Sequence, residues 1–286
     1  MLSLVNSKDL QIKLFIISLV FFGVLAYLLP TSLIDTDYGN VILTIATFLL
    51  GIFAGFCILV TTNDYNSVRE LAADETAGWI SLYNNVQVYD ADSALKLKPL
   101  LSEYIIRSFD YDFIDYARET KPEFRPIQDL INSLPVMESK SSVHQNILDR
   151  IADVTKARQH LTALGNRSLS RLEWLVLFML SFTVIATLYG LRTGSPFFDF
   201  VTIAVSSAIV MILELTYDID RYMWNDASFG FETYNNVLVA MGELPYYRQD
   251  FLQRRIVVPL EKKYQIGILS NHGKSWERKI EIVDKK

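Results

Sequence analysis

Four apolar stretches alternate with polar segments along this chain. They cover residues 14–29, 41–61, 172–190 and 197–217, and the first is the shortest. A helix needs about 20 mostly apolar residues to cross the hydrocarbon layer of a bilayer. Helices are also the open segments that satisfy their own backbone hydrogen bonds in lipid. The pattern therefore predicts four membrane-spanning helices, paired in hairpins within residues 1–61 and 172–217.

Basic residues are nearly absent from the two short links between paired spans. The link over residues 31–40 holds Asp35 and Asp37 and no Lys or Arg, and the link after the third span holds Arg192 alone. Because Lys and Arg accumulate on the cytoplasmic side of membrane proteins, both hairpin tips are predicted to face outward. We therefore expect a protein of a plasma membrane or a bacterial inner membrane, with both termini in the cytoplasm.

The segment over residues 62–171 is predicted to form a cytoplasmic helical region. Apolar residues such as Val68, Leu71, Leu82 and Val86 recur at three- and four-residue steps after the second span. No proline interrupts residues 41–88. The second span is therefore expected to continue into the cytoplasm as one helix of about 70 Å, at about 1.5 Å per residue.

The rest of this region shows further helix signals. Pro99 suits the first turn of a helix, which we expect to stop before Pro122. A short element is expected between residues 126 and 135. Ser142 and Gln145 resemble a capping box, which predicts another helix that continues past residue 165 into the third span.

The C-terminal region, residues 218–286, is predicted to be cytoplasmic as well. Helical patterns cover residues 233–241 and about 247–257, and the lysine-rich tail from about residue 270 is expected to be disordered. Tyr-Asn-Asn-Val occurs at residues 83–86 and again at 234–237, which is too short to indicate a repeat. The predicted fold class is thus all-α, with four spans and a large cytoplasmic helical region.

Composition and motifs exclude several classes of function. The chain has 51% hydrophobic and 21% charged residues, a mixture that fits spans joined to polar regions, and a net charge of −5 that argues against nucleic-acid binding. Cys57 is the only cysteine, so no internal disulfide is possible. His144, His160 and His272 are too far apart to share a metal, and no phosphate loop or nucleophile motif is present. We therefore predict no enzymatic activity, no metal site and no cofactor.

The second span carries small residues on one side. Gly51-x-x-x-Gly55 is typical of close packing against another span. The same face has a second interpretation, because an apolar helix face with hydroxyls at its ends could line a narrow pore in a ring of identical subunits. The candidate pore-lining residues are Thr44, Phe48, Gly51, Gly55, Leu59 and Thr62.

Polar residues also cluster at the predicted inner membrane interface. Glu214, Asp218 and Arg221 follow one another at steps of four and three, so they can share one helix face. Ionisable groups at membrane depth often have a function, although a carboxylate this close to the interface also fits ordinary pairing with a cation. The candidate interface residues are Asn63, Tyr65, Arg69, Glu70, Glu214, Asp218 and Arg221.

Short stretches of the chain resemble a known family. From Gly55 to Glu70 the chain reads Gly-Phe-Cys-Ile-Leu-Val-Thr-Thr-Asn-Asp-Tyr-Asn-Ser-Val-Arg-Glu. This is similar to the bestrophin stretch in which a glycine-bearing span leads into Asn-x-x-Tyr-x-x-x-x-Glu, with Asn63, Tyr65 and Glu70 as correspondents, although one residue instead of two separates Asn63 from Tyr65. The stretch from Arg69 to Glu75, and the sequence Asp-x-Asp-Arg over residues 218–221, resemble bacterial bestrophin-like membrane proteins.

The resemblance implies a homo-oligomer, a pentamer in bestrophins, in which the second span lines a pore for inorganic anions such as chloride. Two departures bear on this. Bestrophins carry a tryptophan pair after the second span, where this chain has Val68 and Arg69, and their pore neck is bulky where this chain has Gly51 and Gly55. No acidic run resembles the calcium clasp of animal bestrophins. The leading hypothesis is an anion channel, and the alternative is a membrane-anchored scaffold or sensor whose cytoplasmic helices bind a partner protein.

Overall fold

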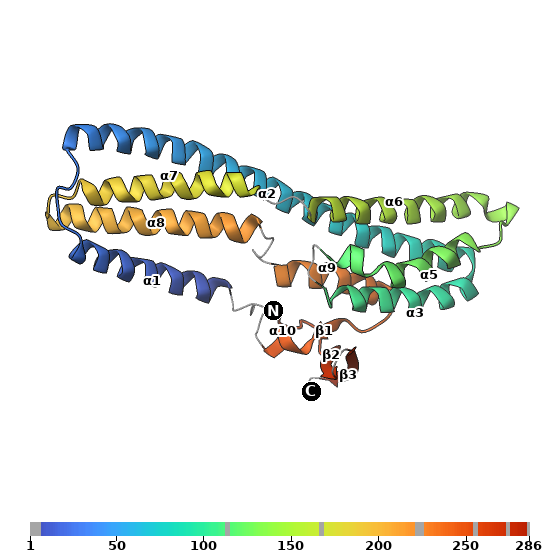
Figure 1. Ribbon diagram of the computed structural model, residues 1–286. Helices are drawn as coiled ribbons and strands as arrows, with labels where there is room; N and C mark the ends of the chain where they lie inside the picture. The colour runs from blue at the N-terminus through green and yellow to red at the C-terminus, as the bar shows by residue number, and fades with distance from the viewer. Residues whose placement is uncertain are drawn as a thin grey trace. The chain divides into compact units, whose positions relative to one another are not determined.

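The computed structural model of the chain is mostly helical (Figure 1). It forms two compact units, one of Met1–Tyr65 with Ser168–Trp224 and one of Asn66–Arg167 with Asn225–Lys286. Both predicted hairpins lie in the first unit, and most of the polar sequence lies in the second. The structure describes residues 7–111, 115–165, 169–220, 226–253, 257–272 and 275–284.

The first unit consists of α1 (Ser7–Leu28), the start of α2 (Thr36–Tyr89), α7 (Arg171–Gly190) and α8 (Pro196–Asp220). By length and composition, α2, α7 and α8 can each cross a membrane. The apolar part of α1, Ile12–Leu28, is shorter than these three. Three of the four predicted spans are therefore confirmed as helices long and apolar enough to cross a membrane, and a span at α1 stays a prediction.

Two apolar clusters hold these helices together. In one, α2 packs through Ala54 and Cys57 against Leu177 and Val184 of α7. In the other, Phe22 and Ala26 of α1 pack with Tyr189 of α7, whose hydroxyl donates a hydrogen bond of 2.7 Å to the Phe22 carbonyl. Accordingly α1 and α2 lie on opposite sides of α7 and α8 (Figure 1).

Backbone hydrogen bonds join the tips of the two hairpins. Ser32 N donates to Arg192 O at 2.7 Å, and Ile34 N donates to Gly190 O at 3.1 Å. Gly190 has no room for a side chain, because a Cβ there would overlap the side chain of Ile34. Ser32 and Gly194 have positive φ values of 59° and 80°, which lets both links turn tightly.

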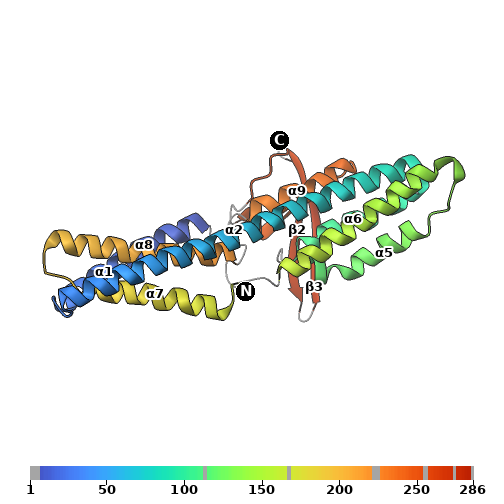
Figure 2. The same ribbon diagram turned by 90° about the horizontal axis from the view of Figure 1, so that it is seen from above.

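The predicted continuation of the second span is confirmed. Helix α2 is unbroken over 54 residues, or about 80 Å at about 1.5 Å per residue. Its buried residues Trp79, Leu82 and Val86 follow the three- and four-residue steps of the sequence. Gly78 lets α6 approach closely, because a Cβ there would lie 2.7 Å from Val154 Cγ2, and α6 lies beside α2 in both views (Figure 2).

The rest of the second unit consists of helices and a small three-stranded sheet. Its further elements are α3 (Ala91–Ser108), α4 (Tyr116–Glu119), α5 (Lys121–Asn132), the 3-10 helix η1 (Glu138–Lys140), α6 (Ser141–Gly165), α9 (Asp226–Ala240), β1 (Tyr246–Arg248), α10 (Gln249–Gln253), β2 (Lys263–His272) and β3 (Ser275–Asp284).

Two predicted helix boundaries in this unit are wrong. Helix α3 begins at Ala91 and not at Pro99, because Asp90 caps it and accepts a hydrogen bond of 3.0 Å from Ser93 N. Pro122 begins a helix instead of stopping one, since it lies in the first turn of α5, where a missing N–H costs little.

The predicted fusion of α6 with the third span is also wrong. Helix α6 ends at Gly165 and α7 begins at Arg171. A capping box separates them: Ser170 Oγ accepts from Glu173 N at 3.3 Å, and Glu173 Oε2 accepts from Ser170 N at 2.6 Å. The two helices are not continuous, because Ser170 has an extended backbone conformation.

The C-terminal region corrects the all-α prediction. Strand β2 pairs in parallel with β1 and antiparallel with β3, so the order is β1-β2-β3. The tail predicted to be disordered from about residue 270 thus contains the end of β2 and all of β3. Residues 246–248 are a strand where a helix was expected, and α10 covers only part of the predicted range.

Candidate functional site

The predicted pore-lining residues share a face of α2 that the rest of the described chain leaves open. Phe48 and Leu59 are 66% and 58% exposed. Thr44, Gly51 and Gly55 are exposed and Thr62 is half-buried. The opposite side of the helix is covered, since Cys57 is fully buried. Within the described chain, the first-unit part of α2 is therefore packed on one side only.

The two glycines of this face have no neighbours in the described chain. A Cβ built at Gly51 or at Gly55 would meet nothing within 4 Å. Among the described residues, no other span of the chain therefore packs against these two glycines, and packing against a span of a second copy stays a prediction. The face remains available to lipid, to a second copy of the chain or to a pore.

The candidate interface residues of α2 differ in exposure. Asn63, Arg69 and Glu70 are exposed, whereas Tyr65 is buried. In α8, Glu214 and Asp218 are half-buried, and Arg221 lies outside the described residues. The structure therefore places Glu214 and Asp218 on one helix, and the expected grouping with Arg221 lies outside the described residues.

Asp220, from the Asp-x-Asp-Arg sequence, has a defined role in the first unit. Its Oδ1 accepts a hydrogen bond of 2.7 Å from Leu169 N, and its Oδ2 accepts one of 3.2 Å from Trp174 Nε1. The carboxylate is buried. It thereby ties the end of α8 to the start of α7.

Glu75, the last residue of the Arg69–Glu75 stretch, is fully buried in the second unit. Its Oε1 accepts from Trp79 Nε1 at 3.1 Å and from the Tyr104 hydroxyl at 2.5 Å. Its Oε2 accepts from the Tyr116 hydroxyl and, at 2.7 Å, from the Tyr234 hydroxyl. Four donors therefore replace the water that the carboxylate loses on burial, as a buried charge requires.

Arg158 of α6 supplies the opposite charge. Its Nη1 lies 3.7 Å from Glu75 Oε1 and also donates to the Tyr104 hydroxyl. Its Nη2 donates to Ala117 O at 2.7 Å. The guanidinium carbon lies 4.3 Å from the centre of the Phe124 ring, which is a cation–π distance. We call Glu75, Tyr104, Tyr116, Arg158 and Tyr234 the Glu75 cluster.

The tyrosines of the cluster are held as neutral hydroxyls. Burial raises the pKa of Tyr104, Tyr116 and Tyr234 well above the usual value of 10.0, and the nearby Glu75 carboxylate raises each pKa further. Protonated hydroxyls can donate to Glu75, whereas phenolates could not. The cluster therefore joins α2, α3, α4, α6 and α9 through donors that stay protonated at physiological pH.

The second Tyr-Asn-Asn-Val sequence contributes to this arrangement. It supplies Tyr234 and also Asn235, whose Nδ2 donates to Tyr246 O at 3.0 Å while its Oδ1 accepts from Tyr246 N at 2.8 Å. Asn235 thus fixes β1 on α9. Sequence reasoning noted this motif without assigning it a role, and it missed the cluster except for Glu75.

The described residues offer no acidic, His or Cys group of three or more that could hold a metal ion. The features that stand out are therefore the open face of α2 in the first unit and the Glu75 cluster in the second.

Comparison with known families decides the classification. The model of the bestrophin-like domain matches residues 12–221, which is most of the chain. The chain belongs to the bestrophin-like family. The resemblance noted at Asn63, Tyr65 and Glu70 is therefore confirmed at the level of the family.

Solved structures of bestrophin-like proteins share the fold. A variant of a bacterial bestrophin homologue from Klebsiella pneumoniae aligns with a TM-score of 0.61 and 12% identity, over 80% of this chain and 99% of the other. The homologue solved by Zn-SAD phasing aligns with a TM-score of 0.58 and 14% identity, over 82% and 99%. At this identity the likeness concerns the fold. No curated protein matches the chain.

Proposed function

We propose that this bestrophin-like chain forms a homo-oligomeric channel for inorganic anions such as chloride, with α2 lining the pore. The family and the fold support a channel-type function. The observation that carries the proposal is the one-sided packing of α2. Cys57 is buried on one side of the helix, while Phe48 and Leu59 are exposed on the other.

The open face has the chemistry of a narrow apolar pore. Phe48 and Leu59 present bulky apolar side chains, and Gly51 and Gly55 between them leave open space. Around the axis of a ring, the two bulky positions would form constrictions that gate by excluding water. The glycines would then form a wider chamber between them.

The oligomer is proposed to be a pentamer in a plasma membrane or a bacterial inner membrane, with both termini cytoplasmic. The two short links between paired spans contain no Lys and only one Arg, Arg192. This supports hairpin tips that face outward. A helix face that the described residues leave uncovered is also what an assembly of several copies would use.

The direct test is chloride flux in liposomes that contain the purified full-length chain. Gly51→Leu and Gly55→Leu should each lower the flux by about tenfold or more, because a side chain in the chamber narrows the pore. Met179→Leu is the control, since it places leucine at a position of α7 that is 61% exposed. Equal flux in all variants would contradict the proposed pore.

Oligomeric state separates the channel from the scaffold or sensor. A view of single particles along the membrane normal should show a ring with a central hole. A monomer without ion flux would overturn the channel. The scaffold is then tested by deleting residues 62–171, which should abolish capture of a partner protein.

A further inference from the structure

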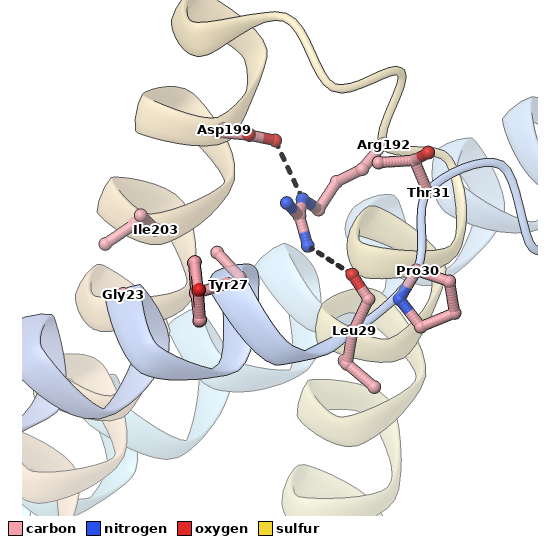
Figure 3. Close-up of a pocket in the computed structure, with 9 residues that line it drawn as sticks. Gly23, Tyr27, Leu29, Pro30, Thr31, Arg192, Asp199 and Ile203 are labelled. Atoms are coloured by element: carbon pink, nitrogen blue, oxygen red, sulfur yellow. Dashed lines mark hydrogen bonds and ion pairs between the residues drawn. The ribbon is translucent and has the colours of Figure 1, made fainter.

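A pocket opens between α1 and α8 close to the joined hairpin tips (Figure 3). Its volume is about 640 Å³. Small residues on α1 create the hollow, and the links between the spans close one end. The lining residues are Gly23, Ala26, Tyr27, Leu29, Pro30, Thr31, Arg192, Asp199 and Ile203.

Arg192 gives the pocket a cation with unused donors. Its Nε donates to Asp199 Oδ1 at 2.7 Å, and its Nη1 makes a long contact of 3.5 Å with Leu29 O. A guanidinium carries five N–H donors, so these two contacts leave several unused. Nη2 has no hydrogen-bond partner among the described residues and is not one of the buried unpartnered atoms. The Arg192 side chain is only 4% exposed, and it lies at the wall of the pocket.

Asp199 gives the same pocket an acceptor. Only its Oδ1 takes part in a hydrogen bond with Arg192, and its side chain is 27% exposed. Oδ2 has no partner among the described residues and can receive a donor from the pocket. The polar end of the pocket is therefore dipolar, with one positive and one negative group side by side (Figure 3).

The remaining surroundings of the pocket are apolar and exposed. Ala26 and Ile203 line the wall, and Tyr27 is 90% exposed where α1 ends. Tyrosines at such positions are typical of the membrane–water interface. On the neighbouring helix surfaces, Leu28 and Phe200 are 69% and 68% exposed. A ligand with a dipolar head and apolar chains fits this arrangement, in which the Arg192–Asp199 pair lies next to the apolar surfaces of α1 and α8.

We propose that this pocket binds the headgroup of a zwitterionic phospholipid, in the leaflet that the hairpin tips reach. The lipid phosphate accepts from Arg192, because guanidinium matches phosphate oxygens in geometry and charge. The lipid ammonium donates to Asp199, and the acyl chains follow α1 and α8. A purely anionic ligand is disfavoured, since Asp199 lies beside the cation and repels it.

This site is independent of the proposed pore. The pocket lies between α1 and α8, and α2 lies on the far side of α7 in the same unit (Figure 1). Lipid binding at this pocket therefore requires that the protein lies in a membrane, but it does not require that the protein conducts ions. Loss of lipid binding and loss of flux can be measured separately.

The test uses native mass spectrometry of the full-length protein, with phosphatidylethanolamine or phosphatidylglycerol added in detergent. Wild-type protein should retain phosphatidylethanolamine in preference to phosphatidylglycerol. Arg192→Gln and Asp199→Asn should each lower that retention by about tenfold, because each removes a charge-assisted hydrogen bond.

A third variant keeps both charged residues in place. Gly23→Leu fills the hollow, since a Cβ at Gly23 meets nothing within 4 Å, and it should lower retention as strongly as Arg192→Gln. Val20→Leu, one turn earlier on α1 at a position that is 62% exposed, is the control and should retain the lipid. Circular dichroism verifies that each variant folds.

Three results would overturn the proposal. Equal retention of phosphatidylglycerol would show that the dipolar head is not recognised. Displacement of the lipid by inorganic phosphate at millimolar concentration would assign the site to a free anion. Undiminished lipid retention in Gly23→Leu would place the lipid elsewhere on the protein.

Discussion

The Tyr234 hydroxyl donates a hydrogen bond of 2.7 Å to Glu75 Oε2, although the two residues are 159 positions apart. Glu75 lies in α2 and Tyr234 lies in α9, so this contact closes the second unit around its long helix. The carboxylate needs the tyrosine to replace lost water, and the tyrosine needs the carboxylate as an acceptor. The contact therefore stabilises the folded second unit.

Removal of the Glu75 charge should destabilise the protein strongly. In Glu75→Gln, Arg158 remains buried without an opposite charge, which costs about 3–5 kcal/mol when a buried pair is broken. The melting temperature in detergent, followed by tryptophan fluorescence, should fall by several degrees. Asp74→Asn, at the exposed neighbouring position, is the matched control and should melt like the wild type. A Glu75→Gln variant that melts with the control would contradict the role of the cluster.

Alkaline pH should weaken the second unit. The pKa values of Tyr104, Tyr116 and Tyr234 are raised well above 10.0 in the folded protein. Above about pH 10 the unfolded tyrosines lose protons that the folded ones keep, so the free energy of unfolding falls by up to about 1.4 kcal/mol per pH unit for each tyrosine. This contribution is complete below about pH 10 and disappears as the pH rises toward the folded pKa values.

Unfolding measured between pH 8 and pH 11.5 tests this dependence. Tyr116→Phe and Tyr234→Phe should each lower stability at pH 8, because a donor to Glu75 is lost. Each should also flatten the decline above pH 10, because one titrating group is absent. A decline of unchanged steepness in both variants would assign the alkaline sensitivity to other groups.

A methyl group at Gly190 should destabilise the joined hairpin tips. A Cβ there overlaps Ile34, and forced overpacking typically costs about 1–3 kcal/mol. Gly23→Ala is the matched control, since its Cβ meets nothing within 4 Å. Thermal unfolding in detergent should show a lower midpoint for Gly190→Ala only. Equal midpoints would mean that the tips separate at little cost.

The predicted orientation can be tested with single cysteines. Cys57 is the only cysteine, so Cys57→Ala yields a background without thiols. In that background, a membrane-impermeant maleimide added to intact cells should label Asp37→Cys at the hairpin tip and leave Lys279→Cys in β3 unlabelled until the cells are opened. If only Lys279→Cys were labelled in intact cells, the predicted orientation would be wrong and the C-terminal region would face outward.

Local patterns in the sequence were sufficient to predict that α2 is one long helix. The absence of proline and the three- and four-residue steps through Leu82 and Val86 predicted that α2 continues unbroken beyond the second span, and the helix begins a few residues earlier than expected, at Thr36. At α3 the same reasoning gave Pro99 too much weight, although Asp90 is a strong capping residue nine positions earlier. Alternation of Ile280 and Ile282 with charged residues signalled β3, but the lysines of the tail suggested disorder instead.

The Glu75 cluster could not be predicted from local sequence patterns. The partners Tyr104, Tyr116 and Tyr234 lie 29, 41 and 159 positions from Glu75. No helical or strand period links residues at such separations, since packing of separate helices decides which of them meet. The buried Glu75 itself did carry a local signal, because Trp79 follows it by four positions on the same helix face.

Each unit carries its own optical reporter. Of the four tryptophans, Trp79 and Trp174 have indole N–H groups that donate to Glu75 and Asp220, respectively. Indole emission responds to the charge and polarity of its surroundings, so a variant that keeps Trp79 or Trp174 and replaces the other three tryptophans reports on one carboxylate. Loosening of the span bundle and opening of the polar unit can thus be followed separately, without an attached dye.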